Sequence, residues 1–157
     1  MPKVISINIS GKKGGAKRPG GSGFFKIDSG LAGDAHSGPG IRQVSLLSKE
    51  SIDRFNKNAE LKKMCVKKGM FGENLTTEGI DLPKLKIGTK LKINNVILEI
   101  SKIGKKCHTV CSIGRNFGTC IMPKEGIFAR VLTEGEIKAG DRIILLAPPA
   151  NITAQCD

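Results

Sequence analysis

Two short apolar runs on either side of an Asn-Asn pair constrain the fold more than any other feature of the sequence. Leu-Lys-Ile precedes the pair at residues 91–93, and Val-Ile-Leu-Glu-Ile follows it at residues 96–100. Aliphatic and β-branched residues favour strands, and Asn tolerates the positive φ that a tight turn requires. The pattern predicts a β-hairpin whose second strand continues through Ile103.

Further short apolar segments extend this β pattern. We expect strands at residues 4–9, 42–47, 127–132 and 142–146, and the 20 glycines of the chain indicate many tight turns between them. Ser48 is predicted to cap a single amphipathic helix that has Glu50 in its first turn and runs to about residue 62. The expected fold class is mostly β, a β-barrel of short strands with a helical insertion. We expect one domain over residues 1–147 and a flexible tail over residues 148–157.

The composition indicates a cytoplasmic protein. No apolar run approaches the ~20 residues of a membrane span, and the alternating residues 4–9 suit a strand better than a signal peptide. The chain has five cysteines. An odd number in that compartment favours free thiols, ligands or catalysts over a disulfide framework.

The formal net charge is +12. Basic domains often bind nucleic acid, but the chain has no Trp and no Tyr, so stacking on bases would depend on six Phe. No helix-turn-helix or zinc-finger signature is present. We therefore favour solvated lysines on strand faces, with a phosphate-bearing small ligand as the next alternative, and expect neither a nucleic-acid nor a membrane partner.

A cysteine-rich segment follows the hairpin. It contains Cys107, His108, Cys111 and Cys120, and two lysines lead into it. Nearby positive charge stabilises a thiolate, the form that attacks sulfur and binds metal. Three interpretations stay open: a nucleophilic or persulfide-carrying cysteine, a structural zinc site without the usual second C-x2-C pair, and thiols buried as packing residues.

Two glycine-rich loops carry further candidates. Residues 11–23 include Lys12 and Lys13 and are expected to form a mobile surface loop, with closure over an anionic ligand as the alternative. Residues 30–40 bring Asp34 and His36 together. His36 could be a general base or a ligand that Asp34 orients, or a loop histidine bonded to a turn.

Glu73 and Asn74 directly follow a glycine. Both side chains can hydrogen-bond to backbone groups, so this position is either a structural corner or a contact to a ligand.

Five segments taken together resemble a known family. They are Gly-Leu-Ala-Gly-Asp-Ala-His at residues 30–36, Arg-Gln-Val-Ser-Leu-Leu at 42–47, Phe-Gly-Glu-Asn-Leu at 71–75, Leu-Lys-Ile-Gly-Thr at 85–89 and the segment that begins at Cys107. In this order they resemble the molybdenum cofactor sulfurase C-terminal (MOSC) domain family in its small single-domain form, over roughly residues 4–146. The resemblance implies a β-barrel that binds the molybdenum cofactor, a pterin-phosphate dithiolene, or transfers sulfur.

The resemblance also implies roles for particular residues. Cys107 would carry persulfide sulfur or touch the metal, with Cys111 in reserve. The residues implied to bind the cofactor are Asp34, His36, Arg42, Glu73, Asn74, Arg130, Lys12 and Lys13.

The sequence departs from larger family members just before the cysteine, where Gly-Lys-Lys stands in place of an Arg and a Pro. Because no pyridoxal-phosphate domain is attached, a cysteine desulfurase would have to supply sulfur, and a molybdoenzyme would receive the product. The alternatives are a non-catalytic cofactor carrier or chaperone and a zinc-stabilised binding module.

Overall fold

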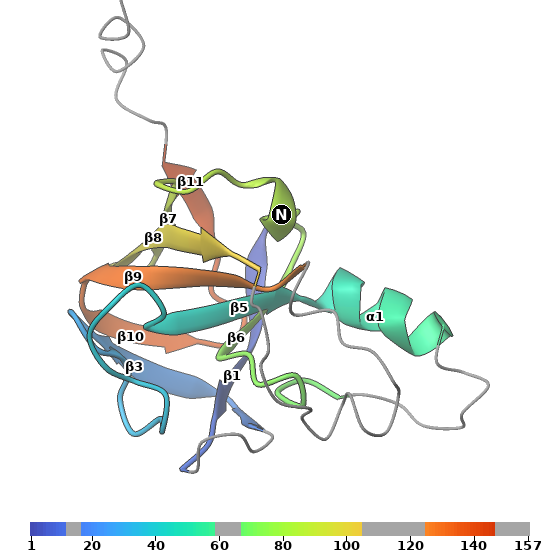
Figure 1. Cartoon of the computed structure of the whole chain (residues 1–157), viewed down its shortest axis with the longest axis horizontal. Helices are drawn as coiled ribbons and strands as arrows, with labels where there is room; N and C mark the ends of the chain where they lie inside the picture. Colours follow the sequence, from blue (N-terminus) through green and yellow to red (C-terminus); the bar gives the residue numbers. More distant parts are fainter. Residues whose placement is uncertain (12–16, 59–66, 105–124, 147–157) are drawn as a thin grey trace, which may run out of the picture.

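The computed structural model describes residues 1–11, 17–58, 67–104 and 125–146, which form two β-sheets and one α-helix (Figure 1). The larger sheet has the strand order β11-β7-β8-β9-β5-β6-β1-β2, and the smaller sheet has the order β10-β3-β4. Neighbouring strands are antiparallel, apart from the parallel pair β5 and β6. The strands are β1 Lys3–Ile9, β2 Arg18–Gly20, β3 Ser22–Lys26, β4 Gly30–Leu31, β5 Val44–Ser48, β6 Leu75–Glu78, β7 Lys90–Ile93, β8 Val96–Ile103, β9 Ile127–Thr133, β10 Gly135–Lys138 and β11 Ile144–Leu146.

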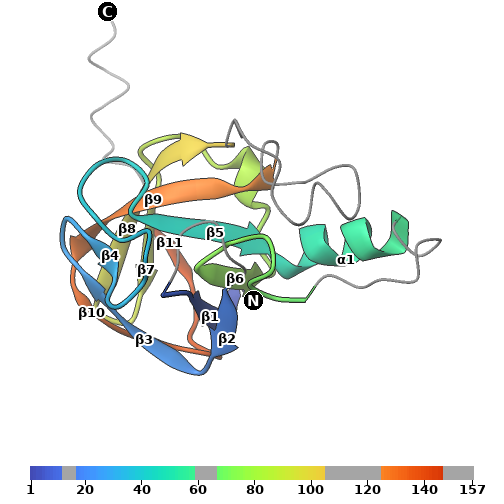
Figure 2. The ribbon, with the colours of Figure 1, turned by 60° about the horizontal axis from the view of Figure 1, so that its bottom comes forward.

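The larger sheet curls until its two ends approach each other, and Figures 1 and 2 show the strands around a common interior. The residues before β11 complete the curl, because the Val4 N–H donates to the Asp141 carbonyl (2.8 Å) and the Ile143 N–H to the Pro2 carbonyl (2.9 Å). β11 itself pairs with β7. One segment therefore contacts β1 with its first half and β7 with its second. The predicted mostly β, barrel-like fold is confirmed.

The alternation of residues along β9 separates the inside of the fold from its outer face. Ile127, Ala129 and Val131 belong to the hydrophobic core, so Phe128 and Arg130 lie on the opposite face of the sheet. In β5, Val44 and Leu46 likewise face the core, and Ser45 lies on the outer face. The β5–β9 register places Ser45 opposite Phe128.

The predicted hairpin and helix cap are confirmed. β7 pairs with β8 from Ile93 opposite Val96 outward, and Asn94 in the turn has a φ of 54°. Helix α1 spans Lys49–Asn58, and the Ser51 N–H donates to the Ser48 hydroxyl (3.1 Å) as an N-cap requires. The expected continuation to residue 62 lies outside the described residues. No helix in the described part of the chain is long and apolar enough to cross a membrane.

Four segments differ from the sequence-based expectation. Residues 17–23 were expected to be loop but contain β2 and the start of β3, and residues 30–31, at the start of the second expected loop, form β4. Residues 135–138 were expected to be a turn-rich link but form β10, and residues 75–78 form β6. β3 pairs with β10 on one side and β4 on the other. Pairing to distant partners, rather than local propensity, makes these segments extended.

Candidate functional site

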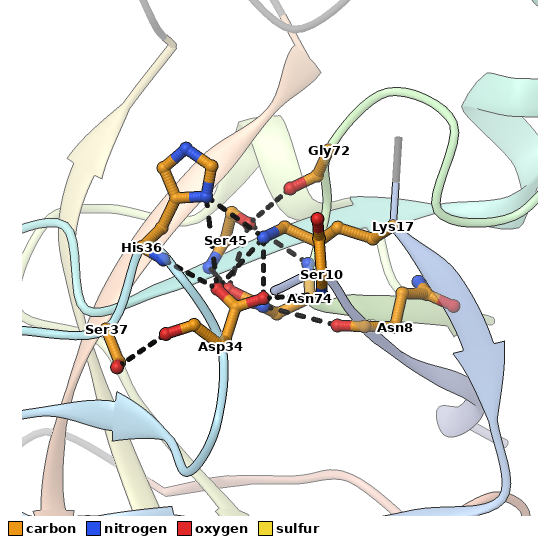
Figure 3. A network of polar contacts seen from close by, with 9 residues as sticks. All are labelled: Asn8, Ser10, Lys17, Asp34, His36, Ser37, Ser45, Gly72 and Asn74. Carbon is orange, nitrogen blue, oxygen red and sulfur yellow. Dashed lines mark hydrogen bonds and ion pairs between the residues drawn. The ribbon is translucent and has the colours of Figure 1, made fainter. Parts of the chain in front are cut away.

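A buried ion pair lies at the centre of the candidate site (Figure 3). The Lys17 Nζ lies 2.8 Å from Oδ1 and 2.9 Å from Oδ2 of Asp34. Both side chains are 1% exposed. Ionised groups withdrawn from water this far persist only when each charge is paired.

Lys17 is held in place by the loop that precedes β6. Its N–H donates to the Gly69 carbonyl (2.8 Å). Gly69 has a φ of +86°, and a Cβ at this position would overlap the Lys17 carbonyl oxygen. Only glycine permits both this backbone angle and this close approach.

The Asp34 carboxylate also organises the backbone around it. It accepts hydrogen bonds from the N–H groups of Ser10 (3.0 Å) and His36 (3.2 Å). Burial by itself raises the pKa of Asp34, but the hydrogen bond and charge of Lys17, together with hydrogen bonds from Ser10 and Asn74, hold it below its ordinary value. Asp34 is therefore ionised.

The imidazole of His36 lies at the edge of this pair. Its Nδ1 is 3.2 Å from the Lys17 Nζ and 4.0 Å from the nearer Asp34 oxygen, and the side chain is 40% exposed. The structure thus brings the predicted Asp34 and His36 together. The carboxylate holds the main chain of His36, and Lys17 contacts its ring.

Asn74 connects the pair to strand β5. Its Oδ1 accepts from the Ser45 N–H (3.1 Å), its own N–H donates to the Ser45 carbonyl (2.9 Å), and its Nδ2 donates to the Asn8 carbonyl (3.3 Å). The Ser45 hydroxyl lies 3.1 Å from the Gly72 carbonyl oxygen. Five stretches of chain that are distant in sequence therefore meet in one network.

Glu73 lies fully buried next to this network. Its Oε2 accepts from the Thr76 hydroxyl (3.0 Å), which accepts in turn from the Asn8 amide (2.9 Å). No hydrogen-bond partner for its Oε1 is present among the described residues. Burial raises the pKa of the Glu73 carboxyl by more than hydrogen bonds from Gly69 and Thr76 lower it, which favours the neutral acid.

The two predicted arginines lie on the outer face of the larger sheet. The guanidinium of Arg42 lies 5.7 Å from the centroid of the Phe128 ring, and Phe128 is the residue opposite Ser45. Arg130 donates to Glu99 (2.9 Å). Arg42 is thus connected to the ion pair through its neighbours. Phe128 lies opposite Ser45, Ser45 is hydrogen-bonded to Asn74, and Asn74 is hydrogen-bonded to Asp34.

The remaining predicted residues, Lys12, Lys13, Cys107 and Cys111, lie outside the described residues, as do the other cysteines and His108. Both ends of the segment that holds Cys107 are described. The Gly104 N–H donates to the Gly126 carbonyl (2.7 Å), and Ile127 pairs with Leu46, the residue after Ser45. The described ranges contain no group of three or more His, Cys, Asp or Glu that could hold a metal ion.

Lys17 is the site residue that sequence reasoning missed. It stands in the same glycine-rich stretch as Lys12 and Lys13, and nothing local separates it from them. Its counter-ion lies 17 residues further along the chain. Only the tertiary structure makes this pairing visible.

Comparisons with known proteins give one family model and several solved structures of similar fold. A model of the MOSC domain matches residues 33–144, and no curated protein matches the chain. Similar solved structures are the YuaD protein from Bacillus subtilis (TM-score 0.72, 18% identity, 91% of this chain and 94% of that chain) and YiiM from Geobacillus stearothermophilus (0.71, 18%, 94% and 76%). YiiM from Escherichia coli is also similar (0.66, 18%, 93% and 70%). At these identities the structural likeness shows the fold alone.

Proposed function

Since the chain belongs to the MOSC domain family, we propose that it binds the molybdenum cofactor or its precursor beside the Lys17–Asp34 pair and transfers sulfur through a persulfide on Cys107. The family is associated with binding and sulfuration of the molybdenum cofactor. One observation carries the proposal. Three segments that resemble the family, around Asp34, Ser45 and Asn74, meet in a single buried network with a half-exposed imidazole at its edge.

The chemistry of the described residues fits such a cofactor. A pterin phosphate combines anionic oxygens with ring atoms that accept and donate hydrogen bonds. The imidazole of His36 and the guanidinium of Arg42 supply directional donors, and the net charge of +12 attracts an anionic ligand. The buried Glu73 oxygen that has no described partner marks unused hydrogen-bonding capacity beside the network.

Within this proposal the residues divide into contacts and supports. His36 and Arg42 would contact the cofactor, with Arg130, Lys12 and Lys13 as further cations toward its phosphate. Asp34, Glu73 and Asn74 are buried and would hold the contacting groups in place. When bound, the cofactor supplies a metal centre for oxygen- or sulfur-atom transfer.

The sulfur step is assigned to Cys107, with Cys111 as the second candidate. The Cys107 thiolate would attack the terminal sulfur of a persulfide on a cysteine desulfurase, release the donor thiolate, and keep the sulfur as a Cys107 persulfide. A molybdoenzyme or its cofactor would then accept this sulfur. On either side of this segment the Gly104 N–H donates to the Gly126 carbonyl, and Ile127 pairs with Leu46 of β5.

The test combines intact mass with metal and pterin content of the freshly purified full chain. The proposal expects a gain of one sulfur atom that reductant removes, that is absent in Cys107→Ala, and that persists in the matched control Cys156→Ala. It also expects bound pterin after incubation with molybdenum cofactor released from a molybdoenzyme. Bound pterin without any sulfur adduct would replace the sulfur-transfer proposal by a non-catalytic carrier. Stoichiometric zinc with neither adduct nor pterin would overturn both in favour of a zinc-stabilised module.

A further inference from the structure

Arg42 and Lys102 are two cations that lie beside the same aromatic ring. The Cζ atom of Arg42 is 5.7 Å from the centroid of the Phe128 ring, within the range of a cation–π contact. Lys102 in β8 is the register partner of Phe128 in β9. Residues opposite each other on neighbouring antiparallel strands have Cβ atoms about 4.5–5.5 Å apart, and the flexible stem of a lysine lets its ammonium reach further still.

An irregularity in β8 places both residues opposite Phe128 on the outer face of the sheet. The β8–β9 register shifts just before Lys102, so that Ser101 is an extra residue of β8 at this point. Phe128 lies on the outer face, because its neighbours along β9 belong to the core. The Ser101 hydroxyl donates to the carbonyl of Ile41, in the loop that leads into β5. This hydrogen bond holds the loop at the outer face, so Arg42 and Lys102 approach Phe128 from the same side of the sheet.

Neither cation is neutralised by an acidic residue in the described part of the chain. Among the described residues, Arg42 and Lys102 have no ion pair and no side-chain hydrogen bond. Strands β8 and β9 contain one acidic residue, Glu99, and its carboxylate lies 2.9 Å from the guanidinium of Arg130. Lys102, rather than Arg130, is therefore the second uncompensated cation beside Phe128.

Phe128 restrains Arg42 without neutralising it. The ring is only 6% exposed although it lies on the outer face, and Arg42 itself is exposed. A cation–π contact attracts the guanidinium through the ring quadrupole and uses no carboxylate, so the charge of Arg42 stays available to an anion. The N–H donors of arginine form a rigid fork that matches the oxygens of a phosphate group, and the ammonium of the half-buried Lys102 adds a compact second charge.

We propose that Arg42 and Lys102 together form a binding site for the phosphate group of a small ligand, with Phe128 as the positioning residue for Arg42. Two cations suit a dianion, because arginine donates in pairs to phosphate oxygens and lysine binds them as a point charge. The site adjoins the buried network, since Phe128 lies opposite Ser45 and the Ser45 N–H donates to Asn74. The assignment of this phosphate to the molybdenum cofactor rests on the proposed function, whereas the phosphate site itself does not.

The site is tested by titration of the full chain with inorganic phosphate. Binding is followed by the backbone amide signals of Arg42, Lys102 and Phe128 in nitrogen-15 NMR, near about pH 8, where a phosphate group is mainly a dianion. Sodium chloride keeps the ionic strength constant, because salt screens exposed charges. We expect saturable shifts of these three signals with phosphate. Shifts that do not saturate, or equal shifts with chloride alone, would overturn the site.

Variants that remove one charge separate a specific site from general attraction to a basic protein. Arg42→Gln and Lys102→Gln should each weaken phosphate binding about tenfold, the effect of one charge-assisted hydrogen bond. The matched control is Lys92→Gln, which removes one positive charge from the outer face of the neighbouring strand β7 and should bind phosphate within about twofold of wild type. Equal weakening in all three variants would overturn the site.

The positioning role of Phe128 has its own readout. Phe128→Leu keeps every charge but removes the ring, so it should weaken phosphate binding about two- to fivefold, the effect of an exposed cation–π contact. It should also remove the ring-current shift of the Arg42 side-chain protons, which a merely structural role would not do. Phe128→Tyr keeps the ring and should restore both. Arg42 signals that are the same in wild type and Phe128→Leu would show that the ring does not position the guanidinium.

Cofactor retention distinguishes the phosphate of the molybdenum cofactor from a free phosphate. If the site binds the cofactor, Lys102→Gln should retain about tenfold less pterin than the control Lys92→Gln. Equal pterin retention by these two variants, with phosphate binding weakened only in Lys102→Gln, would overturn the assignment to the cofactor and leave a site for free phosphate. If wild type retains no pterin, the proposed function fails, and the phosphate titration still decides whether the site exists.

Discussion

Replacement of Lys17 by Met tests whether the buried ion pair holds the site together. Methionine fills a similar volume but cannot donate to Asp34, which would keep the hydrogen bonds from the Ser10 and His36 N–H groups and from Asn74. Loss of one partner from a buried pair costs about 3–5 kcal/mol, because the other charge stays buried and uncompensated. Both side chains are 1% exposed, so water does not screen the remaining charge.

A loss of that size is large compared with the total stability of a domain, which is about 5–15 kcal/mol. For a domain of this size 1 kcal/mol corresponds to about 2–4 °C in Tm, so Lys17→Met should melt about 6–20 °C below wild type. The difference should narrow in acid. The pKa of Asp34 is lowered from 3.8 in the folded state, so its contribution to stability is present above that value and is lost as pH falls through the folded pKa.

The assay is urea unfolding followed by circular dichroism. The double variant Lys17→Met/Asp34→Asn should recover most of the lost free energy of unfolding, because it removes both charges. The matched control is Lys49→Met, which breaks the exposed pair with Asp53 and should lower the free energy of unfolding far less than Lys17→Met, because water screens that pair. A Lys17→Met variant within about 1 kcal/mol of wild type, or a double variant no more stable than the single one, would refute the reasoning.

Three further changes test the surroundings of the pair. Burial raises the pKa of Glu73 above 4.5, so wild type loses stability as pH rises from that value through the folded pKa. Glu73→Gln should remove this loss, so its free energy of unfolding in urea should gain on that of wild type as pH rises above 4.5. A difference that stays constant with pH would contradict this. Gly69→Ala places a Cβ onto the Lys17 carbonyl oxygen at a positive φ, whereas a Cβ at Gly72, which has a similar φ, meets nothing within 4 Å. Calorimetry should therefore show a lower Tm for Gly69→Ala than for Gly72→Ala. Equal Tm values would contradict the close approach of Gly69 to Lys17. Asn74→Ala leaves the Ser45 N–H without its Oδ1 acceptor and should lower the free energy of unfolding by about 1–3 kcal/mol. An unchanged urea midpoint would show that the contact between Asn74 and β5 does not contribute to stability.

Local patterns predicted the parts of the fold that local interactions determine. The turn at Asn94 and the cap at Ser48 depend on residues within a few positions of each other, and both are present. β2, β3 and β10 were not predicted, because their glycine-containing segments become extended through pairing with distant strands. Propensity contains no information about such partners.

The candidate site was likewise predicted only in part. The sequence selected Asp34, His36 and Asn74, which the structure brings together, but it gave no indication of Lys17. A histidine is one of only two in the chain and is easily selected as a candidate, whereas sequence alone does not distinguish one buried lysine from the other basic residues. The role of Cys107 stays a prediction, because that residue lies outside the described ranges.

The hydrogen bonds that join Pro2 and Val4 to residues 140–143 also determine when the protein can fold during its synthesis. β1 pairs with β2 and β6, but the residues that hydrogen-bond to Pro2 and Val4 are translated more than a hundred residues later. The β7–β8 hairpin can form while the chain is still emerging, because its strands are adjacent in sequence. These hydrogen bonds cannot form until residue 143 has left the exit tunnel. Until then the nascent chain carries an unpaired strand edge, the condition in which chaperones bind.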